Sequence, residues 1–303
     1  MPEHAYNGDV RIAYEDLGGH GGDPLLLVMG LGASRFWWPD GLVAELVGQG
    51  FHVVAYDQRD AGESTRFPDR AGAPPFAALV RRRTPAYTAE ALCDDAIAVL
   101  DAVGWDAAHL FGHSMGGLLA QRTAIRHPDR VLTMTSSGAV PSDAAGLAVL
   151  RYLRLGTVAR FARMRSPEGP DAAAAFATAV GDALVAPGRR FEVAEARVIM
   201  AKEAAAGVAS FHDPQAQSRQ IGAKWHGGRL AEVAVPSLVL HGADDPLVRV
   251  SAAHAIANAV PGAGLTVIPG AGHLLHREVW PQYAARLRTF VDRSGTSRTA
   301  RAG

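Results

Sequence analysis

The feature that most constrains the fold is residues 109–117, HLFGHSMGG, a Gly-x-Ser-x-Gly pattern with Ser114 at its centre. An apolar run precedes it and helically spaced apolar residues follow it, so the segment predicts a buried strand, a sharp turn and a helix. Such a turn strains its central residue and leaves little room two positions before and after it, where Gly112 and Gly116 stand. The Ser114 hydroxyl is then expected above the sheet at a helix N-terminus, where backbone N–H groups favour negative charge.

Length and composition favour one large domain. The chain has 303 residues, of which 48% are hydrophobic, which suits a single α/β domain that carries an insertion. The formal net charge is zero, so the charge balance does not indicate a nucleic-acid partner. The sole cysteine, Cys93, excludes an internal disulfide framework and a cysteine-based zinc site, and the pair His212-Asp213 has no further ligand at suitable spacing. We therefore expect neither a metal nor a cofactor.

The expected location of the protein and its expected partners follow in part from two patterns that the sequence lacks. The N-terminal residues show no charged stretch followed by an apolar one, and the sequence contains no run of eighteen apolar residues. We expect a cytoplasmic protein without a membrane partner, either a monomer or a homodimer. The partner that the site residues predict is a small molecule.

Alternating strand and helix patterns predict a mostly parallel central sheet flanked by helices. An Asn-Gly hairpin over residues 7–9 comes first, and the strand, helix and strand of residues 24–56 imply a right-handed parallel crossover. Residues 66–84 lack a clean period and are expected to form an irregular surface excursion. The sheet pattern stops at Pro141 and resumes after a long helix-forming block. The predicted parts are a core of residues 1–140 and 230–293, an inserted helical cap of residues 141–229, and a disordered tail of residues 294–303.

Two later turns supply the groups that would activate a serine. A serine hydroxyl needs a base within hydrogen-bond reach, and the base needs a third group to orient it. Asp244 and Asp245 follow one predicted strand and His273 follows the next, so carboxylate and imidazole meet the serine turn at one edge of the sheet. We favour Asp245 over Asp244 because Pro246 fixes its position. We favour His273 over His276, which lies where a helix has room to begin, and we expect the other histidines to be structural.

Acyl transfer also needs two hydrogen-bond donors aimed at the developing oxyanion. One predicted donor is the backbone N–H of Met115, the residue after the serine. The other is the N–H of Leu31, in the loop after the first buried strand, where Gly30 and Gly32 let the backbone approach a substrate oxygen.

With these three motifs in this order, the chain resembles the α/β-hydrolase superfamily over nearly its whole length. That family usually has His-Gly where this chain has Met29-Gly30, and usually has glycine where Asp60 stands in the segment DQRDAGES of residues 57–64. Both features are similar to the aclacinomycin methylesterase group, which removes a methyl ester from anthracycline polyketides. The resemblance implies an α/β-hydrolase fold with an inserted helical cap.

The activity we expect is that of a serine hydrolase that cleaves a carboxylic ester through a Ser114–His273–Asp245 triad and an acyl-enzyme. The resemblance adds a methyl ester of an aromatic polyketide as the substrate. Lactonase, peptidase, C–C bond hydrolase and perhydrolase chemistry stay open as alternatives, and so does a ligand-binding sensor that kept the fold. An epoxide hydrolase or a haloalkane dehalogenase is disfavoured, because those enzymes place aspartate where this chain has serine.

Substrate contacts are expected just past the loop that carries Leu31. Gly30 lies in that loop, and Phe36, Trp37 and Trp38 follow it, so the three rings are candidates for an aromatic wall on which a polycyclic substrate stacks. The alternative is that the tryptophan pair packs the cap onto the core.

Overall fold

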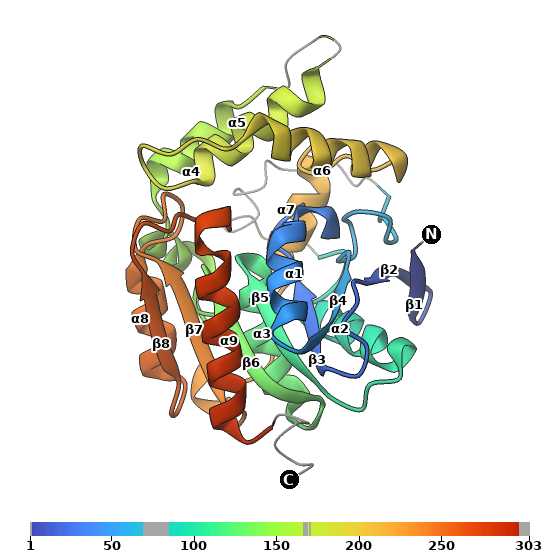
Figure 1. Ribbon diagram of the computed structural model, residues 1–303, viewed down its shortest axis with the longest axis vertical. Coiled ribbons are helices and arrows are strands. Elements are labelled where there is room, and N and C mark those ends of the chain that lie inside the picture. Colours follow the sequence, from blue (N-terminus) through green and yellow to red (C-terminus); the bar gives the residue numbers. More distant parts are fainter. Residues whose placement is uncertain (1, 69–84, 166–168, 170, 297–303) are drawn as a thin grey trace.

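The computed structural model describes residues 2–68, 85–165, 169 and 171–296, and their central feature is an eight-stranded sheet (Figure 1). The sheet order is β1-β2-β4-β3-β5-β6-β7-β8. β1 pairs with β2 and β2 with β4 in antiparallel fashion, whereas all later pairs are parallel. The strands are β1 (Glu3–Asn7), β2 (Val10–Asp16), β3 (Asp23–Val28), β4 (Phe51–Tyr56), β5 (Ala108–His113), β6 (Val131–Ser137), β7 (Ser237–Gly242) and β8 (Gly264–Ile268).

Helices cover both faces of the sheet, and each face carries its own apolar layer. One layer unites α1 and α9 with the sheet, and the other unites α2, α3 and α8 with its opposite face (Figure 1). The helices on the two faces are α1 (Asp40–Gly48), α2 (Ala89–Val103), α3 (Met115–Arg126), α8 (Val250–Ala259) and α9 (Trp280–Ser294). Short 3-10 helices between these elements are η1 (Arg35–Trp37), η3 (Pro128–Arg130), η5 (Leu230–Glu232) and η6 (Arg277–Val279).

The central strands are buried along their whole length, as strands with helices on both faces must be. All six residues of β3 and all six of β5 are buried. The two strands are parallel neighbours, and Val28 at the end of β3 pairs with Gly112 in β5. This register brings the loop that follows β3 next to the turn that follows β5.

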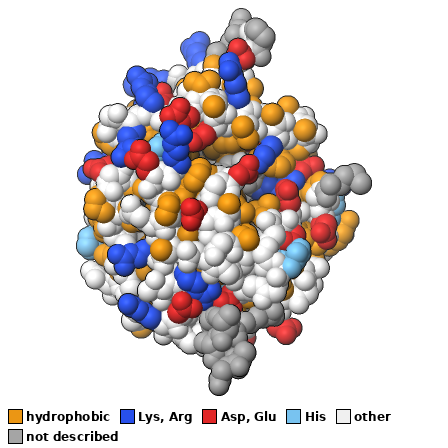
Figure 2. Space-filling view, in the orientation of Figure 1, with side chains coloured by type: hydrophobic (Ala, Val, Ile, Leu, Met, Phe, Trp, Pro, Cys, Tyr) orange, Lys and Arg blue, Asp and Glu red, His pale blue; other side chains and the backbone are white. Residues whose placement is uncertain are grey.

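The chain between β6 and β7 is helical, and residues 141–229 are called the helical segment below. Its elements are η4 (Gly146–Tyr152), α4 (Leu155–Arg163), α5 (Ala172–Leu184), α6 (Val193–Ala205) and α7 (Pro214–Gly222). Figure 1 shows α4, α5 and α6 above the sheet, and Figure 2 shows hydrophobic side chains among the charged ones over this part of the surface. The segment carries four of the five exposed large hydrophobic side chains in the described residues, namely Leu147, Leu155, Val193 and Val198.

The predicted fold class, a mostly parallel sheet flanked by helices, is confirmed. The N-terminal hairpin pairs Asn7 with Val10, and β3, α1 and β4 form the expected parallel crossover. The last helix begins at Trp280 and ends at Ser294, the first residue of the expected tail. Residues 69–84 of the expected irregular excursion and residues 297–303 of the expected tail lie outside the described residues.

Candidate active site

The chain passes from β5 to α3 through a single strained residue, Ser114. Its φ of 57° and ψ of −121° are unusual for a residue with a side chain. A Cβ added at Gly112 would overlap the carbonyl oxygen of Gly116, and one added at Gly116 would overlap the carbonyl oxygen of Val28. The Ser114 N–H donates to the Ser137 carbonyl over 2.8 Å, which anchors the turn on β6. The predicted strand, sharp turn and helix are therefore confirmed, together with the reason for both glycines.

Three side chains from three turns form one line of hydrogen bonds. Ser114 Oγ lies 2.9 Å from His273 Nε2, and His273 Nδ1 lies 2.7 Å from Asp245 Oδ2. The other carboxylate oxygen of Asp245 accepts the N–H groups of Leu247 at 2.7 Å and Val248 at 2.8 Å. Asp245 and His273 are only 1% and 4% exposed. The backbone contacts fix the carboxylate so that its second oxygen faces the imidazole.

The electrostatics of this line favour an ionised Asp245. Burial by itself would raise the pKa of this carboxyl, but the charge and hydrogen bond of His273, together with His241 and the Val248 N–H, outweigh burial and leave the pKa below its ordinary value. His241 Nε2, 3.6 Å from the same oxygen, acts in the same direction. A carboxylate in this position holds the Nδ1 proton of the ring and leaves Nε2 free to accept the serine proton.

The structure also places the two alternatives that the sequence left open. Asp244 is exposed, and its Oδ2 accepts the Gly270 N–H at 3.0 Å. His276 is buried, but its Nδ1 has no hydrogen-bond partner among the described residues. Asp245 and His273, and not their alternatives, are the groups that the fold brings to Ser114.

A second histidine packs beside His273. The rings of His113 and His273 have centroids 5.1 Å apart, and His113 Nδ1 lies 3.2 Å from Ser137 Oγ. Burial, and then the nearby His273, lower the pKa of His113 to about 3. Gly138 lies against both rings, because a Cβ there would be 3.2 Å from His113 and 3.4 Å from His273. His113 is therefore a neutral packing group beside His273, which agrees with the structural role expected of it.

The loop after β3 lies directly against the serine. A Cβ at Gly30 would stand 3.1 Å from Ser114 Cβ and 3.5 Å from its Oγ. Within the described part of the chain, the N–H groups of Leu31 and Met115 have no hydrogen-bond partner. The neighbouring Gly32 N–H, by contrast, donates to Gln220 Oε1 at 3.1 Å. The two predicted oxyanion donors thus have uncommitted protons: Leu31 follows the glycine that lies against Ser114, and Met115 follows Ser114 itself.

Comparison with known proteins agrees with this geometry. Residues 23–278 match the model of the alpha/beta hydrolase fold family. The chain belongs to this family. It is 31% identical to rhodomycin D methylesterase DnrP from Streptomyces peucetius, over 93% of this chain and 95% of that protein. It is 28% identical to a putative carbamate hydrolase RutD from Pseudomonas syringae, over 88% and 93% of the two chains.

Solved structures show the same fold. A meta-cleavage product hydrolase from Pseudomonas fluorescens superposes with a TM-score of 0.71 at 20% identity, covering 96% of this chain and 97% of that one. The resemblance predicted from the motifs is confirmed, and so is the expectation of an α/β hydrolase related to anthracycline methylesterases.

In this α/β hydrolase, the segment after β4 takes part in an ionic network that the sequence did not predict. Asp57 accepts Arg35 Nη1 at 2.6 Å, and the same guanidinium pairs with Glu15 and Glu63. Asp60, the residue in place of the usual glycine, has a φ of 67°. The partners of these groups lie up to about 160 residues away in sequence, so no local pattern could have indicated them.

Asp60 joins the core of the hydrolase to the helical segment. Its two oxygens accept Arg219 Nε and Nη2, each at 2.8 Å, and Tyr87 donates its hydroxyl to the same carboxylate at 2.8 Å. Asp60 is almost completely buried, and Arg219 lies on α7. The departure from the usual glycine therefore gives α7 a charged anchor at the edge of the site.

The aromatic residues after the loop that carries Leu31 have distinct surroundings. Trp37 is buried and packs against Phe191 and Phe211 of the helical segment, with ring centroids 6.4 and 4.9 Å apart. Trp38 is buried against Phe111 of β5. Phe36 is half-buried. The contacts of Trp37 are those of a residue that packs the helical segment onto the core, whereas the ring of Trp38 packs on a core strand. Substrate contact by Phe36, Trp37, Trp38 and Gly30 stays a prediction.

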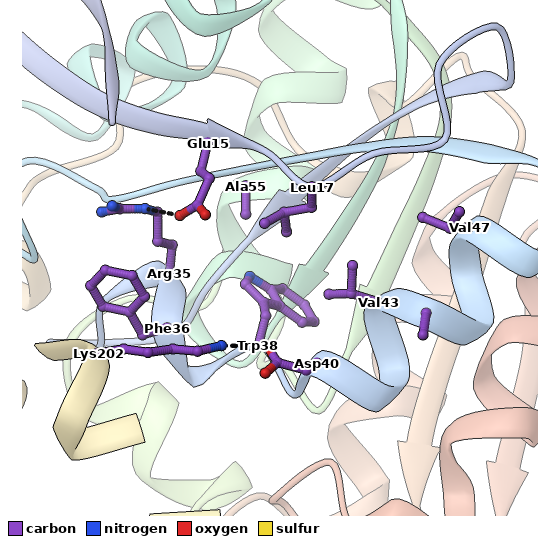
Figure 3. Close-up of a pocket in the computed structure, with 11 residues that line it drawn as sticks. Glu15, Leu17, Arg35, Phe36, Trp38, Asp40, Val43, Val47, Ala55 and Lys202 are labelled. Carbon is purple, nitrogen blue, oxygen red and sulfur yellow. Dashed lines mark hydrogen bonds and ion pairs between the residues drawn. The ribbon is translucent and has the colours of Figure 1, made fainter. Parts of the chain in front are cut away.

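A cavity of about 440 Å³ is bordered by η1, α1 and α6, and Trp38 is one of the residues that line it (Figure 3). Figure 3 shows Arg35 turned toward Glu15, and Lys202 of α6 turned toward Asp40. Phe36 lines this cavity, but Ser114, His273 and Asp245 do not.

One group of side chains in the described residues has the composition of a metal site. Donor atoms of Asp16, His20 and His52 all lie within 4.8 Å of one another. His52 Nε2 is 2.8 Å from Asp16 Oδ2, and His20 Nδ1 is 3.6 Å from the same oxygen, so ion pairing accounts for the cluster. His52 lies near the start of β4, whereas Ser114 follows the end of β5, so the cluster and the serine belong to opposite edges of the sheet.

No helix in the described part of the chain has the length and apolar character needed to cross a membrane.

Proposed function

We propose that this α/β hydrolase is a serine esterase that cleaves the carboxylic ester of a small molecule. The observation that carries the proposal is the line from Asp245 through His273 to Ser114, with distances of 2.7 and 2.9 Å. The relative at 31% identity, a rhodomycin D methylesterase, supports ester hydrolysis as the reaction.

Acylation begins when His273 Nε2 takes the proton of Ser114 Oγ and the oxygen bonds to the ester carbonyl carbon. Asp245 stabilises the imidazolium that results. The carbonyl oxygen becomes an oxyanion that accepts the N–H groups of Leu31 and Met115, and donors of this kind are worth about 3 kcal/mol each. The carbon–oxygen bond to the leaving group then breaks, His273 returns its proton to the alkoxide, and an alcohol leaves.

Deacylation repeats these steps with water. His273 takes a proton from the water, whose oxygen bonds to the acyl carbon, and the bond to Ser114 Oγ breaks as His273 returns the proton to the serine. The sum of the two stages is one ester and one water converted to one acid and one alcohol.

For the substrate, we propose a methyl ester of an aromatic polyketide, with methanol as the alcohol released. The name of the rhodomycin D methylesterase relative supports this class. In the proposal, the helical segment acts as the predicted cap, and Gly30, Phe36, Trp37 and Trp38 border the ring system of the substrate. Carbamates are the second class to test, because a putative carbamate hydrolase aligns over 88% of the chain.

The experiment compares p-nitrophenyl esters, aromatic methyl esters, lactones and aryl carbamates as substrates of the wild type, Ser114→Ala and His273→Ala. Both variants are expected to lose roughly 10³-fold or more in kcat on any ester that the wild type turns over. Preference for methyl esters supports the polyketide ester, whereas preference for carbamates or lactones replaces it. Wild-type activity in Ser114→Ala, or no ester hydrolysis by the wild type, contradicts the esterase.

A further inference from the structure

The helical segment is hydrogen-bonded to each of the turns that carry Asp245 and His273. The carbonyl of Leu184, the last residue of α5, accepts the N–H groups of His273 at 2.8 Å and of Leu274 at 2.9 Å. Arg154 Nε donates to the carbonyl oxygen of Asp245 at 2.9 Å. These contacts come from a part of the chain that supplies none of the three reacting side chains. The loop that carries Leu31 is also held by the helical segment.

The contact with the loop that carries Leu31 is made by the side chain of Gln220. This residue lies on α7 and is only 3% exposed. Its Oε1 accepts the Gly32 N–H at 3.1 Å, and its Nε2 donates to the Arg59 carbonyl at 2.9 Å. The amide thus bridges the loop after β3 to the loop after β4, and both ends of its functional group are used.

The contact removes one N–H of the loop from those that can face the substrate. With the Gly32 proton committed to Gln220, the neighbouring Gly30 and Leu31 N–H groups have no partner among the described residues, and Leu31 is the donor that the sequence predicts. The loop is held on two more sides, since Gln58 donates to the Met29 carbonyl and the Phe211 N–H donates to the Gly32 carbonyl at 3.0 Å. A loop fixed this way presents the Leu31 N–H before substrate arrives, which is the condition for strong oxyanion stabilisation.

We propose that Gln220 is a positioning residue for the oxyanion hole, acting through Gly32 on the Leu31 N–H. The inference rests on the proposed function, because it assigns Leu31 to the oxyanion of acyl transfer. It adds to the proposed site a residue that lies more than a hundred positions after both Leu31 and Ser114 in the sequence. It also predicts that α7 affects the rate of the chemical step and not only the binding of substrate.

Two variants separate the hydrogen bond from the space that the side chain fills. Gln220→Met keeps a chain of similar length but removes both hydrogen bonds, and we expect kcat to fall about 10- to 100-fold with KM changed less than about twofold. Gln220→Glu keeps an acceptor for the Gly32 N–H, so its kcat is expected between that of wild type and that of Gln220→Met. If Gln220→Met does not fold, Gln220→Asn, which withdraws the amide by one methylene, takes its place.

A second readout does not need the natural substrate. A fluorophosphonate probe forms a bond between its phosphorus and Ser114 Oγ while fluoride leaves and His273 takes the serine proton, and its P=O oxygen occupies the oxyanion position. The labelling rate of Gln220→Met is expected to fall by about the same factor as kcat. A purely structural role for Gln220 would lower the melting temperature and leave the labelling rate of the folded protein at the wild-type value.

The matched control is Lys202→Met, which breaks another contact between the helical segment and the core, the 2.5 Å ion pair of Lys202 with Asp40. Its kcat and labelling rate are expected to stay within about twofold of wild type, because surface ion pairs contribute little. Wild-type rates in Gln220→Met overturn the proposal, and so does a loss in Lys202→Met or Gln220→Glu as large as that in Gln220→Met. A wild type that is labelled at Ser114 but hydrolyses no ester refutes the proposed function and leaves the labelling comparison as the test of Gln220.

Discussion

Replacement of Asp245 by asparagine tests how closely the reaction depends on one oriented oxygen. Asp245 Oδ1 accepts two backbone N–H groups, so the carbonyl oxygen of an asparagine must take that place and its NH₂ must face His273 Nδ1. The ring then accepts a hydrogen bond at Nδ1 and carries its proton on Nε2. With that tautomer, Nε2 donates to Ser114 and no longer accepts its proton.

The magnitude follows from the loss of the base. A wrong tautomer is expected to lower kcat by about 10⁴-fold, which corresponds to about 5.4 kcal/mol of transition-state stabilisation. Rotation of the amide would restore the tautomer but would leave the N–H groups of Leu247 and Val248 facing an NH₂ group. Each buried donor without an acceptor costs about 1 to 3 kcal/mol, so about 2 to 6 kcal/mol keeps the amide in the inactive orientation.

The assay is steady-state hydrolysis of a p-nitrophenyl ester, with the melting temperature measured for each variant. Asp244→Asn is the matched control, because Asp244 is the adjacent residue, is exposed, and contacts only the Gly270 N–H among the hydrogen bonds of its side chain in the described residues. Its kcat is expected to stay within about twofold of wild type. The reasoning is refuted if Asp245→Asn keeps more than about a tenth of the wild-type kcat, or if Asp244→Asn loses as much as Asp245→Asn.

Three further predictions follow from single contacts. The pKa of His113 is lowered to about 3 in the folded protein, so below about pH 6.5 the unfolded chain binds more protons than the folded one. The free energy of unfolding should therefore fall by about 1.4 kcal/mol per pH unit down to about pH 3. Urea unfolding from pH 7 to pH 4 should show a smaller fall for His113→Gln than for the wild type. Asp60→Gly relieves a positive φ but removes the buried carboxylate that pairs with Arg219, so urea unfolding should show a loss of about 2 to 4 kcal/mol, and a gain in stability would contradict this. Gly30→Ala places a methyl group 3.5 Å from Ser114 Oγ. This variant should hydrolyse esters with a kcat about tenfold lower than that of the wild type, at a nearly unchanged melting temperature. A wild-type kcat would count against the close approach of this loop to Ser114.

Local chemistry explains what the sequence could predict. The glycines at 112 and 116 are required by the backbone carbonyls that they face, so the turn at Ser114 is visible from three residues. The choice of Asp245 over Asp244 could be made because a proline fixes the turn, and Asp245 is the residue that contacts His273. In these places the cause of the structure lies within a few residues of its effect.

Long-range pairing explains what the sequence could not predict. Nothing near Gln220 indicates that its amide contacts Gly32 and Arg59, since those residues lie about 160 to 190 positions earlier. The same holds for Glu203 on α6, a buried carboxylate that accepts Ser34 Oγ at 2.7 Å and Trp37 Nε1 at 3.1 Å. Helical periodicity identifies the buried face of a helix but not the partner of a polar group on it. Polar groups that join the helical segment to the core therefore appear only in the structure.

These polar contacts bear on how rate and specificity are divided in this hydrolase. If the helical segment served only to enclose substrate, changes in it would alter KM and leave kcat alone. Yet its backbone holds the turn of His273, its Arg154 holds that of Asp245, and its Gln220 holds the loop of Leu31. The proposed reacting groups are thus held in place by contacts with the helical segment. Exchange of this segment for that of a relative with another substrate should consequently lower kcat even on small p-nitrophenyl esters, unless the partners of these three contacts are exchanged with it.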